Sequence, residues 1–140
     1  MKKVHETIAG FIYLFLISFF CYTAVNKLMN LQSFRINLVK TSLFSEDVAN
    51  WFSVAVIIIE IVVILILLFY KKVGLFLLSC LILIFTVYIS FLRFKGLYEV
   101  CGCGGVLNGL KYSHHLSINI ALFFGALYST FIFNKQINEK

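Results

Sequence analysis

The stretch that decides the fold is residues 51–92, WFSVAVIIIEIVVILILLFYKKVGLFLLSCLILIFTVYISFL. Two apolar runs of about 20 residues, 51–70 and 73–92, flank the basic pair Lys71 and Lys72. About 20 apolar residues are needed for a helix to cross a hydrocarbon core roughly 30 Å thick. Backbone groups in lipid must be paired within their own segment, which favours helices. The stretch therefore predicts a transmembrane helical hairpin.

The rest of the chain has the same character. It contains two further apolar runs, 8–25 and 116–133. The 140 residues are 61% hydrophobic and 13% charged and include no proline, whereas about 25% of the residues in a soluble domain are charged. We therefore expect an all-α integral membrane protein. It should be a single four-helix transmembrane domain over residues 1–140, with spans at about 8–25, 51–70, 73–92 and 116–133.

The net charge of +6 comes from basic residues scattered between the apolar runs. This distribution fits anchoring at lipid headgroups and gives no support to a nucleic-acid partner. Four spans place both termini and the turn at Lys71 and Lys72 on one side, and the two long loops, 26–50 and 93–115, on the other. The twelve Lys and Arg residues divide equally between the sides. Those on the terminal side are denser and less offset by acidic residues, so we expect both termini in the cytoplasm, with the protein in the bacterial inner membrane.

The first long loop carries apolar residues at near-helical spacing, Leu31, Phe34 and Leu38, followed by Leu43 and Phe44. The residues between them are mostly polar. This pattern predicts a short amphipathic helix in the first outer loop. This helix would lie on the outer membrane surface; the alternative is a structured loop that packs on the bundle.

The second long loop contains LYEVCGCGGVLNG, residues 97–109, with Cys101 and Cys103 separated by one residue. Cα atoms at that spacing can lie about 5.5–7 Å apart, which overlaps the range that a disulfide tolerates. The flanking glycines supply unusual dihedral angles and leave the sulfurs uncovered: Gly102, Gly104 and Gly105. A strained small-ring disulfide is easily reduced, so the pair predicts a redox-active bond on an outer face that permits disulfides. A static disulfide and two free thiols are the alternatives.

Several basic side chains neighbour the cysteine pair in sequence. His114, His115, Arg93 or Lys95 could raise the fraction of thiolate, the form that attacks a disulfide. The histidines and cysteines could also bind zinc or copper. Adjacent histidines usually point in different directions and Cys-x-Cys has a narrow bite, so we expect no metal. The other reading of the histidines is an interfacial role without chemistry.

Glu60 is the acidic residue that falls inside a predicted span, near its middle. A carboxylate at that depth is costly unless it is protonated, paired or in a polar cavity, and it is a functional candidate by default. Its possible partners are Lys27 at the end of the first span, Tyr22, Asn119 or a proton. The alternative role is a structural hydrogen bond between helices.

Four motifs recur together in this chain: NKLMNLQSF at 26–34, Glu60 in the second span, CGCGG at 101–105, and HLSINIAL at 115–122, which contains Asn119. With four spans, this pattern resembles the MauE branch of the DoxX-like membrane proteins over essentially the whole chain. Gly104 stands where that family's Cys-x-Cys-Phe-Gly motif carries an aromatic residue. Members are associated with redox maturation of exported proteins, including disulfide formation in methylamine dehydrogenase, and DoxX relatives with thiosulfate–quinone oxidoreduction.

The resemblance implies a membrane thiol–disulfide redox protein, a possible oxidoreductase. Cys101 and Cys103 would exchange electrons with an exported thioredoxin-like or cysteine-containing protein. If electrons cross the membrane, a quinone bound among the helices near Glu60 is the simplest electron carrier. No residue in the sequence by itself identifies a quinone site. The alternative is a non-catalytic subunit of a larger membrane complex, or a maturation partner, whose Cys-Gly-Cys loop is a fixed disulfide docking site.

Overall fold

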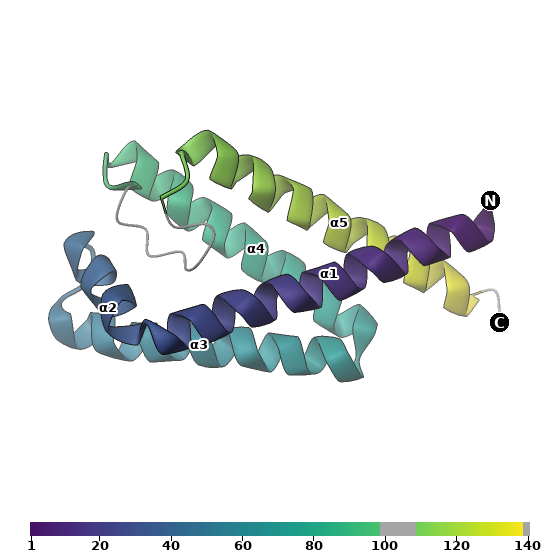
Figure 1. Ribbon diagram of the computed structural model, residues 1–140, viewed down its shortest axis with the longest axis horizontal. Helices are drawn as coiled ribbons and strands as arrows, with labels where there is room; N and C mark the ends of the chain where they lie inside the picture. The colour runs from purple at the N-terminus through teal and green to yellow at the C-terminus, as the bar shows by residue number, and fades with distance from the viewer. Residues whose placement is uncertain (99–108, 139–140) are drawn as a thin grey trace.

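A computed structural model describes residues 1–98 and 109–138 of the chain (Figure 1). This part of the chain forms the helices α1 (Lys2–Met29), α2 (Leu31–Lys40), α3 (Glu46–Phe69), α4 (Lys71–Phe94) and α5 (Tyr112–Asn138). Four of them, α1, α3, α4 and α5, are long and apolar enough to cross a membrane. The predicted all-α transmembrane bundle is therefore confirmed. The expected spans lie within these longer helices, apart from Tyr70, which lies between α3 and α4.

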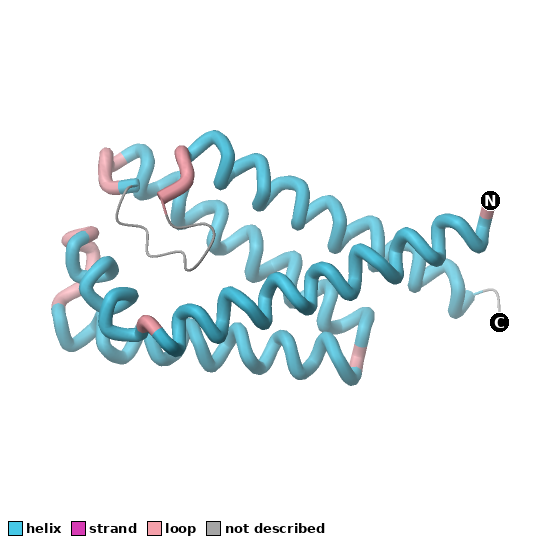
Figure 2. Tube along the Cα trace, viewed as in Figure 1, coloured by secondary structure: helices cyan, strands magenta, loops and turns pink. Residues whose placement is uncertain are grey.

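The four long helices form a closed ring in which α1 packs against α3 and α5, and α4 packs against the same two helices. The start of α1 and the end of α5 lie at one end of the bundle, and α2 lies at the opposite end (Figures 1 and 2). Both termini are thus on the same side, as an even number of spans requires.

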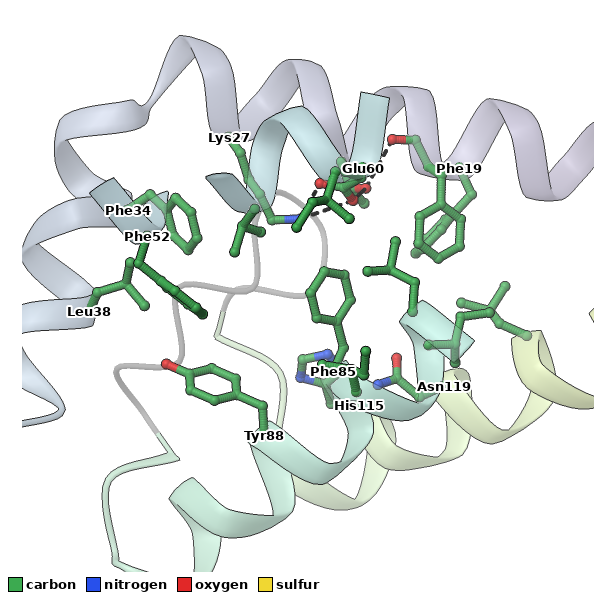
Figure 3. A pocket seen from close by; sticks show the side chains of 18 residues that line it. Phe19, Lys27, Phe34, Leu38, Phe52, Glu60, Phe85, Tyr88, His115 and Asn119 are labelled. Carbon is green, nitrogen blue, oxygen red and sulfur yellow. Dashed lines mark hydrogen bonds and ion pairs between the residues drawn. The ribbon is translucent and has the colours of Figure 1, made fainter. Parts of the chain in front are cut away.

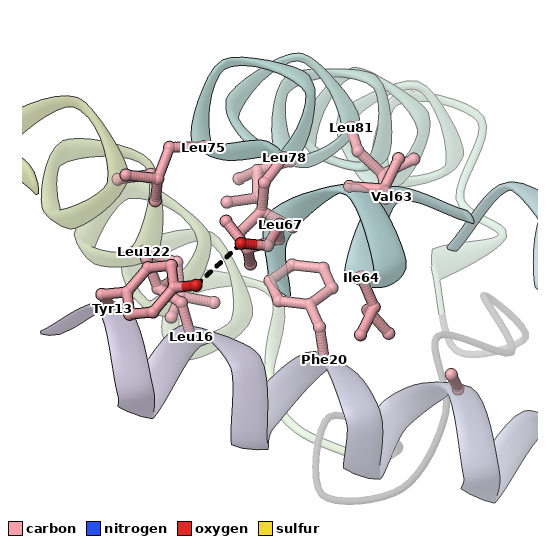
Figure 4. Packing of buried hydrophobic residues seen from close by; sticks show 13 residues of the cluster. Tyr13, Leu16, Phe20, Val63, Ile64, Leu67, Leu75, Leu78, Leu81 and Leu122 are labelled. Carbon is pink, nitrogen blue, oxygen red and sulfur yellow. Dashed lines mark hydrogen bonds between the residues drawn. The ribbon is translucent and has the colours of Figure 1, made fainter. Parts of the chain in front are cut away.

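The core is built from aliphatic side chains of all four long helices, together with Tyr13 and Phe20 of α1 (Figure 4). Leu67, Leu75 and Leu78 have no exposed surface. The outward faces are also apolar, and Phe11 and Phe131 are 70% and 67% exposed. Outer surfaces of this kind suit a protein whose surroundings are lipid.

The hairpin of α3 and α4 is very tight because one residue, Tyr70, separates the two helices. A Cβ on Gly74 would overlap the backbone of Leu67, so only glycine lets the first turn of α4 lie against the last turn of α3. The carbonyl of Leu67 belongs to that last turn, and the Tyr13 hydroxyl of α1 donates a hydrogen bond to it at 2.7 Å. This bond satisfies a helix-end carbonyl that has no partner within its own helix.

The predicted amphipathic helix is present as α2, and it packs against α3. Phe34 and Leu38 are buried against Ala49 and Ile57. The segment is thus a helix, as the first expectation had it, and it packs on the bundle, as the alternative of a structured loop had it.

Candidate functional site

A buried ion pair joins α1 to α3. The Lys27 Nζ donates to Glu60 Oε1 at 3.1 Å and to Oε2 at 2.9 Å. The Lys27 side chain is 5% exposed and the Glu60 side chain is 0% exposed. Of the partners considered for Glu60, the structure selects Lys27, because Tyr22 is 47% exposed and Asn119 bonds elsewhere. The pair makes the buried carboxylate and ammonium electrically neutral together.

Thr23 completes the polar cluster around the carboxylate. Its hydroxyl lies 2.8 Å from Glu60 Oε1 and 3.0 Å from the carbonyl of Phe20. Thr23 and Lys27 are four residues apart, so they share one face of α1 and approach Glu60 together. We did not predict Thr23 from the sequence, although its spacing from Lys27 is the signal that could have found it.

Next to this cluster lies a cavity of about 250 Å³, to which all five helices contribute (Figure 3). Its walls are mainly apolar, with several aromatic rings: Phe19, Phe20, Phe34, Phe52, Phe85 and Tyr88. Lys27 and Glu60 lie on one side, and His115 and Asn119 lie on the other, with Phe85 between them (Figure 3). The Lys27 Nζ is 5.2 Å from the centre of the Phe85 ring, within the range of a cation–π contact.

His115 is held in one tautomer by its contact with Tyr98. The Tyr98 hydroxyl donates to the carbonyl of Leu110 at 2.9 Å and lies 3.0 Å from His115 Nδ1. A carbonyl can only accept, so the single hydroxyl hydrogen goes to Leu110 and the Tyr98 oxygen accepts Nδ1–H of His115. Neutral His115 therefore carries its lone pair on Nε2. The residue is 2% exposed and lines the cavity.

Asn119 lies one helical turn after His115 and is fixed by α4. Its Nδ2 donates to Thr86 Oγ1 at 3.2 Å, and Thr86 donates in turn to the carbonyl of Ile82 at 2.7 Å. This bond uses one of the two amide hydrogens of Asn119. The cavity wall thus carries two oriented polar side chains from α5.

A protein-family model, that of the methylamine utilisation protein MauE, matches residues 5–132. The chain belongs to the MauE family. It is therefore a multi-pass membrane protein of that family, and the resemblance expected from its motifs is confirmed. No curated protein and no solved structure matches the chain.

Two other candidate residues of this MauE-family chain, Arg93 and His114, are not among the described residues that line the cavity. Arg93 is near the end of α4, with its guanidinium 6.0 Å from the centre of the Tyr112 ring. His114 is exposed beside buried His115. The cysteine pair and its glycines, Cys101, Gly102, Cys103, Gly104 and Gly105, lie outside the described residues. Within residues 1–98 and 109–138, no three His, Cys, Asp or Glu side chains gather to hold a metal ion.

Thr23→Val tests the contribution of the hydroxyl to the cluster. Valine keeps the shape of threonine but removes the donor to Glu60, so the free energy of unfolding should fall by about 1–2 kcal/mol. Detergent-induced unfolding followed by circular dichroism measures the change. Thr7→Val is the matched control, because the Thr7 hydroxyl is exposed and bonds only its own helix at Lys3. Equal stability of the two variants would show that Thr23 contributes nothing to the cluster.

Proposed function

We propose that this MauE protein is a thiol–disulfide redox protein of the bacterial inner membrane, with both termini in the cytoplasm. Cys101 and Cys103 alternate between a dithiol and a disulfide. They exchange electrons with an exported thioredoxin-like or cysteine-containing protein. Membership of a family described by methylamine utilisation supports a membrane accessory role.

The observation that carries the proposal is the position of the two described ends of the cysteine-containing segment. Tyr98 precedes the segment and Leu110 follows it, and the hydroxyl of the first bonds the carbonyl of the second at 2.9 Å. The same hydroxyl contacts His115, which lines the cavity. The described residues on the two sides of the segment therefore lie beside a polar wall of the cavity, which supports a link between thiol chemistry and the interior of the bundle.

The exchange itself follows ordinary thiol–disulfide chemistry. A client thiolate attacks the Cys101–Cys103 disulfide, forms a mixed disulfide and displaces one thiolate of the pair. The second client thiolate then attacks the mixed disulfide. The client leaves with a disulfide, and Cys101 and Cys103 are left as a dithiol. The neighbouring basic residues Arg93, Lys95 and His114 favour the thiolate form.

Two complementary cysteine variants test the proposal. One variant carries Cys21→Ser and Cys80→Ser, which replaces the two half-buried free thiols in the helices and leaves only Cys101 and Cys103. The other carries Cys101→Ser and Cys103→Ser. In proteoliposomes, the first variant should oxidise reduced thioredoxin mole for mole, and the second should show only the background rate. Maleimide gel shifts measure the oxidation of both proteins.

The redox potential separates a cycling disulfide from a fixed one. A cycling pair should titrate above about −300 mV, whereas structural disulfides lie below that value. A potential below it, or full biological activity of the Cys101→Ser, Cys103→Ser variant, would contradict the proposal. The first of these outcomes would favour a non-catalytic partner whose fixed disulfide shapes a docking loop.

The proposed orientation has its own test. A membrane-impermeant maleimide should label reduced Cys101 and Cys103 in spheroplasts of cells that produce the Cys21→Ser, Cys80→Ser variant. Labelling confined to inverted vesicles would place the termini outside and refute the orientation.

A further inference from the structure

We propose that the cavity binds the ring of a membrane-dissolved quinone, with Lys27 and Asn119 as hydrogen-bond donors to its carbonyl oxygens and His115 as an acceptor for the hydroxyl groups of its reduced form. The redox role of this quinone rests on the thiol–disulfide function proposed above. The binding site itself rests only on described residues. No part of it depends on the segment that contains the cysteines.

The size of the cavity fits one small ring. An apolar protein cavity of about 150 Å³ can hold benzene, and this one has a volume of about 250 Å³. The additional space accommodates ring substituents. Phe85 lies between the two polar sides of the cavity, and aromatic side chains such as Phe19 and Phe52 line the walls (Figure 3). Such walls favour a flat aromatic or quinoid ligand through offset or edge contacts.

The polar groups match a ligand with an oxygen at each end of a ring. Lys27 has three N–H donors, and two of them bond Glu60. The third is left for the Phe85 face or for a ligand oxygen, and a carbonyl oxygen is the stronger partner. On the opposite side, Asn119 retains a second amide hydrogen beyond the one that bonds Thr86. A quinone has two carbonyls on opposite sides of its ring, so it can accept from both sides of the cavity.

The reduced form of the ligand also finds partners in this site. A quinol has two hydroxyl groups in place of the carbonyls, so it must donate hydrogen bonds. The Tyr98 contact leaves the lone pair of neutral His115 on Nε2, and Asn119 carries an amide oxygen. Both oxidation states can therefore be hydrogen-bonded, as a carrier that turns over requires.

A lipid acyl chain explains the cavity less well. It has no polar atoms, so a cavity for it needs no charged or polar wall. This cavity is bordered by a buried ion pair, and His115 and Asn119 are 2% and 5% exposed on its other side. Polar groups buried beside a purely apolar occupant would lose hydrogen-bonding capacity, which is costly in a low-dielectric interior.

The redox step balances with this carrier. Two thiols, those of Cys101 and Cys103, lose two electrons and two protons and form one S–S bond. One quinone gains two electrons and two protons and becomes a quinol. The resulting disulfide then oxidises the exported client, and the quinol leaves into the bilayer.

The binding test uses the Cys101→Ser, Cys103→Ser variant in nanodiscs, so that thiol chemistry has no part in the signal. Tritiated decylubiquinone is the probe, and a scintillation proximity assay measures its binding. We expect saturable binding of one probe per protein. Unlabelled decylubiquinone should displace it, whereas decylbenzene, which has the same chain on a ring without oxygens, should not.

Two substitutions locate the site. His115→Leu should weaken binding of the reduced probe, tritiated decylubiquinol, about tenfold, and the neutral double variant Lys27→Met, Glu60→Leu should weaken binding of decylubiquinone about tenfold. Each loses one hydrogen bond to the ligand. His114→Leu is the matched control for the first and should bind normally, because His114 is exposed next to buried His115. If the double variant is not monodisperse, the ligand affinities of His115→Leu and His114→Leu alone decide whether the ligand binds in the cavity.

Three results would overturn the site: no saturable binding, equal displacement by decylbenzene, or normal affinity in a folded variant of either kind. Failure here is distinguishable from failure of the thiol function. Normal oxidation of thioredoxin without quinone binding removes only the quinone site. Quinone binding together with unimpaired activity of the Cys101→Ser, Cys103→Ser variant removes only the thiol function.

Discussion

Lys27→Met should lower the free energy of unfolding by about 3–5 kcal/mol. The substitution removes both N–H donors that bond Glu60 and leaves a buried carboxylate, with 0% exposure, facing apolar walls. Thr23 can donate only one hydrogen bond, which does not compensate a full negative charge. Unfolding of the purified protein in mixed micelles, followed by circular dichroism, measures the loss.

The removal of both charges separates the cost of an orphaned charge from the value of the pair. The variant Lys27→Met, Glu60→Leu should regain most of the lost stability, because replacing a whole buried ion pair with apolar groups is often neutral. Lys40→Met is the matched control, since Lys40 is exposed at the end of α2, and it should change little. A Lys27→Met protein as stable as Lys40→Met would contradict the ion pair.

Gly74→Ala should destabilise the protein by at least about 2 kcal/mol. The added Cβ would overlap the backbone of Leu67, which cannot rotate away as a flexible side chain could. The turns of α3 and α4 would have to separate, and the hydrogen bond from Tyr13 to the Leu67 carbonyl would be disturbed. Thermal unfolding in detergent measures the effect.

Gly10→Ala is the control for this prediction. Gly10 is also within a membrane-spanning helix, but a Cβ there would meet nothing within 4 Å. Alanine is favoured over glycine inside a helix by about 0.5–1 kcal/mol, so this variant should be as stable as the parent or more so. If the two variants unfolded alike, the close approach of Gly74 to Leu67 would be wrong.

The architecture was predictable from the sequence because each membrane-spanning helix can be recognised from its own run of apolar residues. The length of an apolar run is measured against the thickness of the bilayer, and no long-range contact is needed. The inclusion of Tyr70 in the expected span has a local cause as well. Tyrosine is apolar enough to extend a hydrophobic run, whereas the chain turns there before Lys71.

The candidate site was only partly predictable. The cost of a mid-span carboxylate singled out Glu60, and Lys27 was one of several possible partners. The choice between them depended on how far α1 continues beyond its apolar run, and it reaches Met29. The contact of Tyr98 with His115 and the overlap avoided at Gly74 join parts of the chain whose proximity is set by helix packing. Such contacts leave no periodic signal in the sequence.

The two sides of the cavity come from helices that are synthesised at different times. The Lys27–Glu60 side of the cavity comes from α1 and α3, and both emerge before α5. The opposite side, His115 and Asn119, belongs to α5, which closes the ring against α1 through Ser129 and the Ala9 carbonyl. Both residues of the ion pair are therefore synthesised before the residues that complete the pocket. A ligand that contacts both sides of the cavity can therefore bind only after α5 has been synthesised.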